Sequence, residues 1–116
     1  MTSSNRSWSF ASRVVPVIVL TDVSQAVPLA HALLEGGVDV MEITLRSHAG
    51  LAGIEAVARN VPQMHVGAGT VTRAVDMRQV SDAGARFALS PGLTPELHLA
   101  AQEHRISFMP GVMTPS

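Results

Sequence analysis

The sequence predicts an α/β protein built around a parallel β-sheet, because two regularities run along the chain. Apolar runs of strand length recur with centres about 20 to 25 residues apart, the length of one strand, one helix and their loops. The segments between these runs carry helix caps and helically spaced apolar residues. Such strand–helix repetition gives parallel strands joined by right-handed crossovers. The five predicted strands are residues 14–20, 38–45, 64–71, 87–90 and 106–110.

The first helix is predicted over residues 24–35. Ser24 is a typical N-cap residue, Pro28 stands near the first turn, and Gly36 with Gly37 ends the helix. Its buried stripe is expected to consist of Ala26, Ala30, Leu33 and Leu34.

The second helix is predicted over residues 49–59 and ends before Asn60 and Pro62. Its interior contains Gly50 and Gly53, each of which weakens a helix by about 1 kcal/mol relative to alanine. The apolar face that supports the prediction consists of Leu51, Ile54, Val57 and Ala58.

The third and fourth helices follow the same pattern. The third is expected from Thr72 to Gly84, with Val75 and Val80 packed against the sheet. The fourth has the clearest start, because the N-cap candidate Thr94 is followed by a proline and then by a glutamate in the first turn.

Composition narrows the class of protein. A chain of 116 residues suits one domain, here 14–116, preceded by the polar, serine-rich segment 1–13. A net charge of −1 argues against a nucleic-acid partner, and no apolar run approaches the roughly 18 residues of a membrane span. The absence of cysteine excludes disulfides, zinc–thiolate sites and a cysteine nucleophile. All 8 basic residues are arginines, so no side chain of this sequence provides a lysine amine.

Two parallel architectures compete for this pattern, an open doubly wound sheet and a (β/α)₈ barrel. A dinucleotide-binding open sheet is disfavoured because no G-x-G-x-x-G follows the first strand, and Gly-Ala-Gly at 67–69 matches it only in part. SPGLTP at 90–95 resembles MPGVMTP at 109–115, but only the first leads into a helix. The sequence thus stops where a fifth helix is expected, which indicates an interrupted repeat of about five strands and four helices.

The second strand carries polar residues on one face. Alternate apolar residues suit packing against helices, whereas Glu42, Thr44 and Arg46 share the opposite face. Parallel strands are normally apolar on both faces, so this polar face requires a reason. The functional interpretation is a general acid/base, Glu42, beside an anion-binding Arg46. The structural alternative is a buried Glu–Arg pair or an exposed edge strand.

Two more residues stand at the ends of neighbouring strands. Thr70 ends the third strand, and Pro91 follows the fourth within Ser-Pro-Gly. Ligands bind at the carboxyl ends of parallel strands, so Glu42, Arg46, Thr70 and Pro91 are expected to converge on one rim. The structural alternative for Thr70 is a helix cap or a turn residue.

The five histidines fit no local metal-ligand motif. His48 lies just past the second strand and could reach the rim, although an exposed loop position is the plainer interpretation. A metal held by Glu42 with His48 or His65 has weak support. No metal and no cofactor is predicted.

Taken together, these residues resemble the 2-dehydro-3-deoxy-phosphogluconate (KDPG) / 4-hydroxy-2-oxoglutarate (KHG) aldolase family. The resemblance covers nearly everything from residue 14 onward. It implies an α/β fold in which 14–116 is the N-terminal part of a (β/α)₈ aldolase barrel, truncated to about five strands and four helices, a half-barrel. Such barrels are about twice as long as this chain and are usually trimers. The matching segments are VVPVIVL (14–20), ALLEGGVDVMEITLR (32–46), VGAGTV (66–71), DAGARFALSPGLTPEL (82–97) and MPGV (109–112).

The resemblance implies a cytoplasmic class I aldolase, in which a lysine on the sixth strand forms a Schiff base with the keto acid. The reaction is cleavage of KDPG to pyruvate and glyceraldehyde 3-phosphate, or of KHG to pyruvate and glyoxylate. Carried over residue by residue, Glu42 moves protons through a water, Arg46 binds the keto-acid carboxylate, Thr70 lines the pyruvyl pocket and Pro91 borders it. The implied partners are small keto acids and further copies of the chain.

The sequence departs from the family because the Schiff-base lysine is absent. Three alternatives therefore stay open: half of a split enzyme completed by a second chain, a non-catalytic remnant that binds keto acids, and a metal-dependent aldolase. For the chain by itself, open sheet edges and inward-facing residues such as Val17, Val40 and Ala68 predict association, aggregation or marginal folding.

Overall fold

The computed structural model describes residues 15–92 and 94–110, and within them five strands alternate with four α-helices. The predicted polar segment 1–13 and the second Thr-Pro, at 114–115, lie outside these residues. The strands are β1 (Val17–Ile18), β2 (Val40–Thr44), β3 (His65–Gly69), β4 (Phe87–Ser90) and β5 (Ser107–Pro110). The helices are η2 (Val23–Gln25, a 3₁₀ turn), α1 (Ala26–Glu35), α2 (Ala49–Asn60), α3 (Ala74–Ala83) and α4 (Pro95–Glu103).

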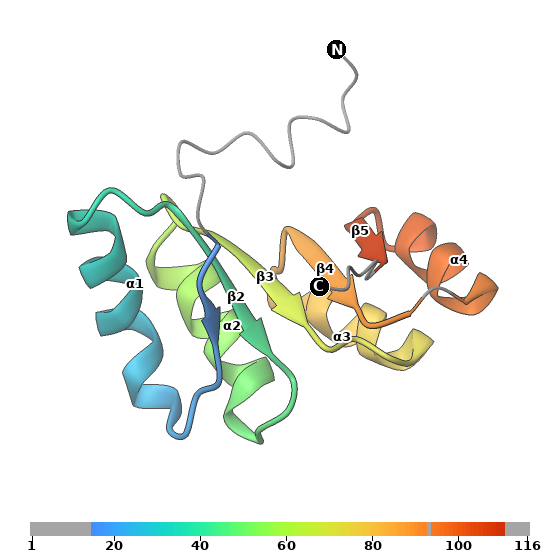
Figure 1. The fold of residues 1–116 in the computed structure, drawn as a ribbon, viewed down its shortest axis with the longest axis horizontal. Coiled ribbons are helices and arrows are strands. Elements are labelled where there is room, and N and C mark those ends of the chain that lie inside the picture. Colours follow the sequence, from blue (N-terminus) through green and yellow to red (C-terminus); the bar gives the residue numbers. More distant parts are fainter. Residues whose placement is uncertain (1–14, 93, 111–116) are drawn as a thin grey trace, which may run out of the picture.

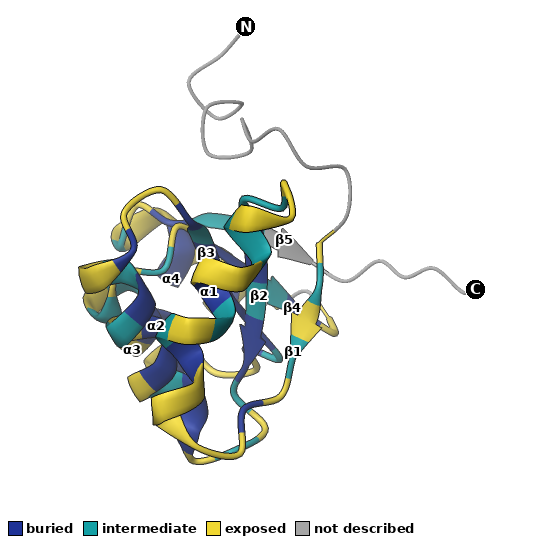
Figure 2. Ribbon diagram, turned by 90° about the vertical axis from the view of Figure 1, so that its left-hand side faces the viewer, coloured by how far each residue is buried: buried dark blue, intermediate teal, exposed yellow. Residues whose placement is uncertain are grey.

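The sheet is parallel throughout, with the strand order β1-β2-β3-β4-β5 (Figure 1). This order contains no reversal, so the described strands do not form the doubly wound alternative. Because every crossover runs in the same sense, the four α-helices lie on one side of the sheet (Figure 2). We use the name inner face for the side of the sheet that no described helix covers.

Strand register identifies the residues of the inner face. Val17 pairs with Glu42, Glu42 with Gly67, and Gly67 with Phe87, so these four positions form one row across β1 to β4. Val17 is 56% exposed, as expected for a side that no helix covers. Phe87 is fully buried but stands apart from the helix-side cluster, so its burial belongs to the inner face.

The main core fills the space between the sheet and the helices. Ala68 belongs to this core, because its register partners Ile43 and Ala88 are buried there as well. The expectation that Ala68 faces inward and meets water is therefore wrong, since alternation along β3 points it toward the helices. Val40 does lie on the inner-face side of β2, yet it is fully buried.

The two glycines of α2 bring this helix close to the sheet. A Cβ at Gly50 would overlap the carbonyl oxygen of Thr44, and a Cβ at Gly53 would overlap the side chain of Leu20. The loss of helix propensity at these positions is thus offset by backbone approach and packing. The buried side of α2 is also rotated from the predicted one, because Gly50 and Gly53 are buried whereas Leu51 is only half-buried.

Helix α1 begins later than predicted, because Ser24 does not cap it. Asp22 accepts a hydrogen bond from the Ser24 backbone N–H (2.9 Å), which starts η2 before α1 begins at Ala26. The buried residues of α1 are Ala26 and Ala30, while the two leucines of the predicted stripe are half-buried.

Helices α3 and α4 test the remaining predictions. Val75 is 43% exposed, so its expected packing is wrong, and Met77 is buried together with Val80. The start predicted for α4 is confirmed, because the Thr94 hydroxyl accepts a hydrogen bond from the Leu97 N–H at 3.2 Å. None of the helices within the described ranges is long and apolar enough to cross a bilayer.

Candidate active site

Three of the predicted site residues follow the carboxyl ends of three neighbouring strands. Arg46 comes two residues after β2, Thr70 directly after β3 and Pro91 directly after β4. Because the strands are parallel and adjacent, these residues lie along one edge of the sheet. Arg46 and Pro91 are exposed, whereas Thr70 is half-buried.

Strand β2 is shorter than predicted, which changes the position of Arg46. The last ladder bond joins the Leu45 N–H to the Gly69 carbonyl at 3.0 Å, and the chain then turns toward α2. The Arg46 N–H donates to the Thr44 hydroxyl at 3.4 Å. Arg46 is therefore a turn residue, because strand alternation ends at Thr44, and the prediction of a shared strand face holds only for Glu42 and Thr44.

Glu42 lies on the inner face with its side chain half-buried. A Cβ built at Gly69 would overlap the Glu42 carboxylate, so this side chain lies over the backbone of β3. Among the described residues, no hydrogen bond or ion pair engages the carboxylate. Strand β2 also has neighbours on both sides. Within the described residues, Glu42 therefore forms no buried Glu–Arg ion pair and does not lie on an exposed edge strand, the two forms of the structural alternative.

Two opposing influences set the pKa of Glu42. Burial raises the pKa of the carboxyl above its ordinary value, because the ionised form loses solvation, and the positive charge of Arg46 partly offsets this rise. A carboxyl group in such a setting accepts and returns a proton nearer to neutral pH. The inner face therefore holds a side chain suited to general acid/base chemistry.

Thr70 has an unusual backbone conformation. Its φ of 61° lies in the left-handed region, which β-branched residues rarely adopt. Such a conformation costs about 1–3 kcal/mol and concentrates at functional sites. The next residue, Val71, is fully buried and donates its N–H to the Leu89 carbonyl at 3.0 Å, which holds the chain in place. The strain marks this edge of the sheet independently of Glu42.

The sequence pattern of the β3 glycines was considered only as a partial dinucleotide-binding match, so their place beside Glu42 was not predicted. A Cβ at Gly67 would overlap the ring of Phe87, just as one at Gly69 would overlap Glu42. The Gly-Ala-Gly segment therefore provides room for two side chains of the inner face. The sequence signal was that Gly67 and Gly69 are two residues apart in one strand. Glycines with this spacing share a face of the strand and often mark a place where a neighbouring group approaches the backbone closely.

The histidines do not assemble a metal site with Glu42. In the ranges that the structure describes, no three His, Asp or Glu side chains come together as ligands. His48 is exposed at the start of α2, in agreement with the plainer interpretation. The His65 ring lies at the amino end of β3, where its Nδ1 is 2.8 Å from the Arg86 guanidinium.

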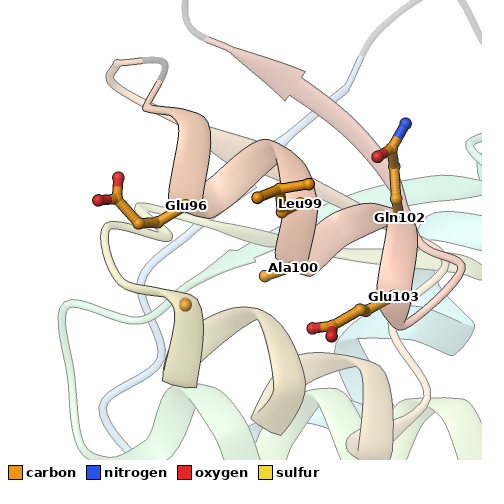
Figure 3. Close-up of a pocket in the computed structure, with 6 residues that line it drawn as sticks. Glu96, Leu99, Ala100, Gln102 and Glu103 are labelled. Atoms are coloured by element: carbon orange, nitrogen blue, oxygen red, sulfur yellow. The ribbon is translucent and has the colours of Figure 1, made fainter.

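A surface hollow of about 550 Å³ lies away from these residues, between α3 and α4 (Figure 3). Its lining includes the buried Ala100 and Leu99, which is 60% exposed. Glu96 and Glu103 extend from opposite ends of α4 beside it (Figure 3). None of the predicted site residues contributes to it. The inner face and its carboxyl edge therefore remain the candidate active site.

Comparison with known proteins identifies the family of this chain. A family model described as KDPG and KHG aldolase matches residues 7–116. The KHG/KDPG aldolase of Escherichia coli (strain K12) is 50% identical over 103 residues, covering 89% of this chain and 48% of the relative. The 2-dehydro-3-deoxy-phosphogluconate aldolase of Pseudoalteromonas atlantica is 46% identical over 114 residues, covering 92% of this chain and 53% of the relative.

A solved structure gives the same result. The crystal structure of KDPG aldolase from Legionella pneumophila, with pyruvate captured at low pH as a covalent carbinolamine intermediate, matches with a TM-score of 0.87 and 42% identity. The match covers 97% of this chain and 54% of that chain. The chain belongs to the KDPG and KHG aldolase family. It spans about half the length of the relatives that it matches.

Proposed function

We propose that this chain forms the proton-transfer side of a class I keto-acid aldolase. The substrates are KDPG, cleaved to pyruvate and glyceraldehyde 3-phosphate, or KHG, cleaved to pyruvate and glyoxylate. The described strands would be the first five of a (β/α)₈ barrel. The observation that carries the proposal is the half-buried Glu42 carboxylate on the inner face, beside the edge that holds Arg46 and Thr70.

Covalent catalysis begins with an amine that adds to the C2 carbonyl of the keto acid. The resulting carbinolamine loses water and becomes a protonated imine, which later accepts the electron pair of the broken bond. The carbinolamine captured in the Legionella pneumophila enzyme supports this chemistry for the family. No lysine occurs in these 116 residues, so the proposal assigns the amine to polypeptide beyond them.

Glu42 moves the protons of the cleavage step, through a water molecule. The Glu42 carboxylate, acting through this water, removes the proton of the C4 hydroxyl. The C3–C4 bond then breaks, and the aldehyde leaves. The electron pair of that bond passes to the imine nitrogen and gives an enamine. The protonated carboxyl then returns a proton to C3, and water releases pyruvate from the imine. A carboxyl whose pKa is raised by burial suits both directions of transfer.

The edge residues bind and orient the substrate. Arg46 presents an exposed guanidinium, whose parallel N–H donors fit the keto-acid carboxylate. Thr70, held in its left-handed conformation, lines the pyruvyl pocket, and Pro91 borders it. Substrate binding and proton transfer thus fall to different side chains.

Kinetics of the natively isolated protein test this division of roles. Glu42→Gln is expected to lower kcat for cleavage by about 10²–10⁴-fold with little change in KM, because proton transfer is lost. Arg46→Gln is expected chiefly to raise KM. The measurement is pyruvate release from KDPG and from KHG. Wild-type turnover by Glu42→Gln would overturn the acid/base role, and cleavage of neither substrate by the parent protein would favour a keto-acid-binding protein without turnover.

A further inference from the structure

The geometry points to Gly69 as a positioning residue, because its missing side chain creates the seat in which the Glu42 carboxylate lies over β3. The inference rests on the proposed acid/base role of Glu42 and adds to it a residue that touches neither substrate nor reacting atoms. Glycine is often required where the backbone φ is positive, but Gly69 does not have a positive φ. The requirement for glycine here is instead the space that its missing side chain leaves.

Strand register explains how the seat arises. Glu42 is directly opposite Gly67, and Thr44 is directly opposite Gly69. The space over Gly67 is taken by the ring of Phe87, which is fully buried. The Glu42 side chain therefore extends along the sheet toward the carboxyl edge and lies over Gly69. The two glycines accommodate different neighbours, an aromatic ring and a carboxylate.

The three atoms nearest to a methyl group added at Gly69 all belong to the Glu42 side chain. The new Cβ would overlap Oε2 of Glu42 and lie only 2.8 Å from its Cδ and 3.0 Å from its Cγ. Relaxed carbon contacts need about 3.5–4.0 Å, so the carboxylate must move by about 1 Å or more. Glu42 has a flexible and only half-buried side chain, so the shift costs the fold little. At Gly67 the obstacle is instead a buried ring that cannot move in this way.

Two consequences follow for Glu42 in a Gly69→Ala variant. A displacement of about 1 Å can slow a reaction by about 10²-fold, because the proton no longer has a short path to the substrate. The displaced carboxylate also moves toward solvent, so the pKa of Glu42 falls toward its ordinary value, since burial is what raises it. Arg46 is untouched, so binding of the keto-acid carboxylate is retained.

The experiment compares Gly69→Ala with two other glycine variants of the natively isolated protein. Gly36→Ala, at the end of α1, is the neutral control, because its Cβ would meet only two carbonyl oxygens at 3.6 and 3.7 Å. Gly67→Ala is the control for crowding on the same strand. The readouts are melting temperature, kcat and KM for cleavage, hydrogen–deuterium exchange at C3 of pyruvate, and a ¹³C NMR titration of the Glu42 carboxyl.

We expect Gly69→Ala to melt close to the parent protein while kcat and proton exchange fall about 10–100-fold and KM stays within about twofold. The Glu42 titration should move to lower pH. Gly36→Ala should match the parent in every readout, and Gly67→Ala should lower the melting temperature most. In a Glu42→Asp background the shorter side chain clears the methyl group, so Gly69→Ala should have a much smaller effect there.

The outcomes separate the two proposals. The role of Gly69 in positioning Glu42 would be contradicted if Gly69→Ala changed neither pyruvate proton exchange nor the Glu42 titration. A loss of activity that only follows a lower melting temperature would contradict it as well. If the parent protein neither cleaves the two keto acids nor exchanges pyruvate protons, the proposed function fails. The NMR titration still decides whether Gly69 seats the carboxylate in that case.

Discussion

Ionisation of Glu42 reduces the stability of the fold. Burial raises the pKa of this carboxyl in the folded protein above the ordinary 4.5, despite the opposing charge of Arg46. Below pH 4.5 the folded and unfolded chains both hold the proton, and the stability contribution is complete. As the pH rises through the raised pKa, the unfolded chain binds fewer protons than the folded one, and this contribution is lost.

Glu42→Gln should therefore be more stable than the parent protein at neutral pH. The advantage arises because glutamine is never ionised, and it should vanish as the pH falls to 4.5 or below. Urea unfolding as a function of pH measures the difference. Glu55→Gln removes the same charge at an exposed position of α2 and should show no comparable gain. Stability curves of Glu42→Gln and parent that run parallel from pH 4 to 8 would contradict the cost of burying Glu42.

Helix α3 depends on one buried carboxylate at its start. Asp76 accepts hydrogen bonds from the backbone N–H groups of Thr72 (3.3 Å) and Arg73 (3.1 Å) and from the Arg73 guanidinium (2.8 Å). Burial alone would raise the pKa of Asp76, but these hydrogen bonds outweigh it, and the pKa is lowered. The carboxylate thus satisfies backbone donors that begin the helix.

Asp76→Ala should lower the free energy of unfolding by about 1–2 kcal/mol at pH 7. The loss should shrink as the pH falls below 3.8, because the contribution of a lowered pKa is complete above the unfolded value of 3.8 and disappears as the pH falls through the folded pKa. Urea unfolding at several pH values provides the measurement. Asp82→Ala, at an exposed position on the same helix, serves as the control. Equal losses for the two variants would argue against the helix-start role of Asp76.

Helix starts that depend on a few consecutive residues were predictable from the sequence. Features that depend on contacts with other parts of the fold were not. Thr94 and the proline after it predict the start of α4, and the structure confirms this start. The start of α1 failed because Asp22 opens a 3₁₀ turn before Ser24 can act as a cap. The packing expected for Val75 failed because helical spacing alone does not fix which side meets the sheet.

The same division applies to the candidate site. Alternation along β2 correctly placed Glu42 and Thr44 on one face, because it needs only the strand itself. The position of the Glu42 carboxylate over Gly69 could not be predicted from the sequence, because it depends on the register of β2, β3 and β4. The left-handed backbone of Thr70 was likewise unforeseen, because nothing in its residue type favours that conformation.

At the scale of the whole sheet, the inner face exposes apolar side chains on the side of β1. Val17 of β1 is 56% exposed, and Val19, two residues later and on the same side by strand alternation, is 50% exposed. The outermost described strands, β1 and β5, each have one unpaired edge in the described sheet. Parallel sheets are normally covered on both faces, and open edges invite pairing with other chains.

The 116-residue polypeptide, expressed by itself, should therefore associate in solution. Size-exclusion chromatography with light scattering measures its mass. Val17→Thr keeps the shape and strand preference of valine but makes the inner face more polar, so it should shift the equilibrium toward monomer. Val75→Thr makes the same change on the outer side of α3, where valine is 43% exposed, and should leave association unchanged. A parent polypeptide that elutes as a monomer and melts cooperatively would contradict this prediction.

The most direct test of the aldolase assignment is an intact-mass spectrum of the natively isolated protein after treatment with pyruvate and borohydride. Borohydride reduces a protonated imine to a stable secondary amine, so it records the covalent intermediate itself. We predict a single pyruvate-derived adduct on a species about twice as heavy as the 12.2 kDa of these residues, in keeping with relatives of which this chain covers about half. A protein that carries no adduct, or a 12.2 kDa chain modified at its α-amino group, would contradict the proposed origin of the amine.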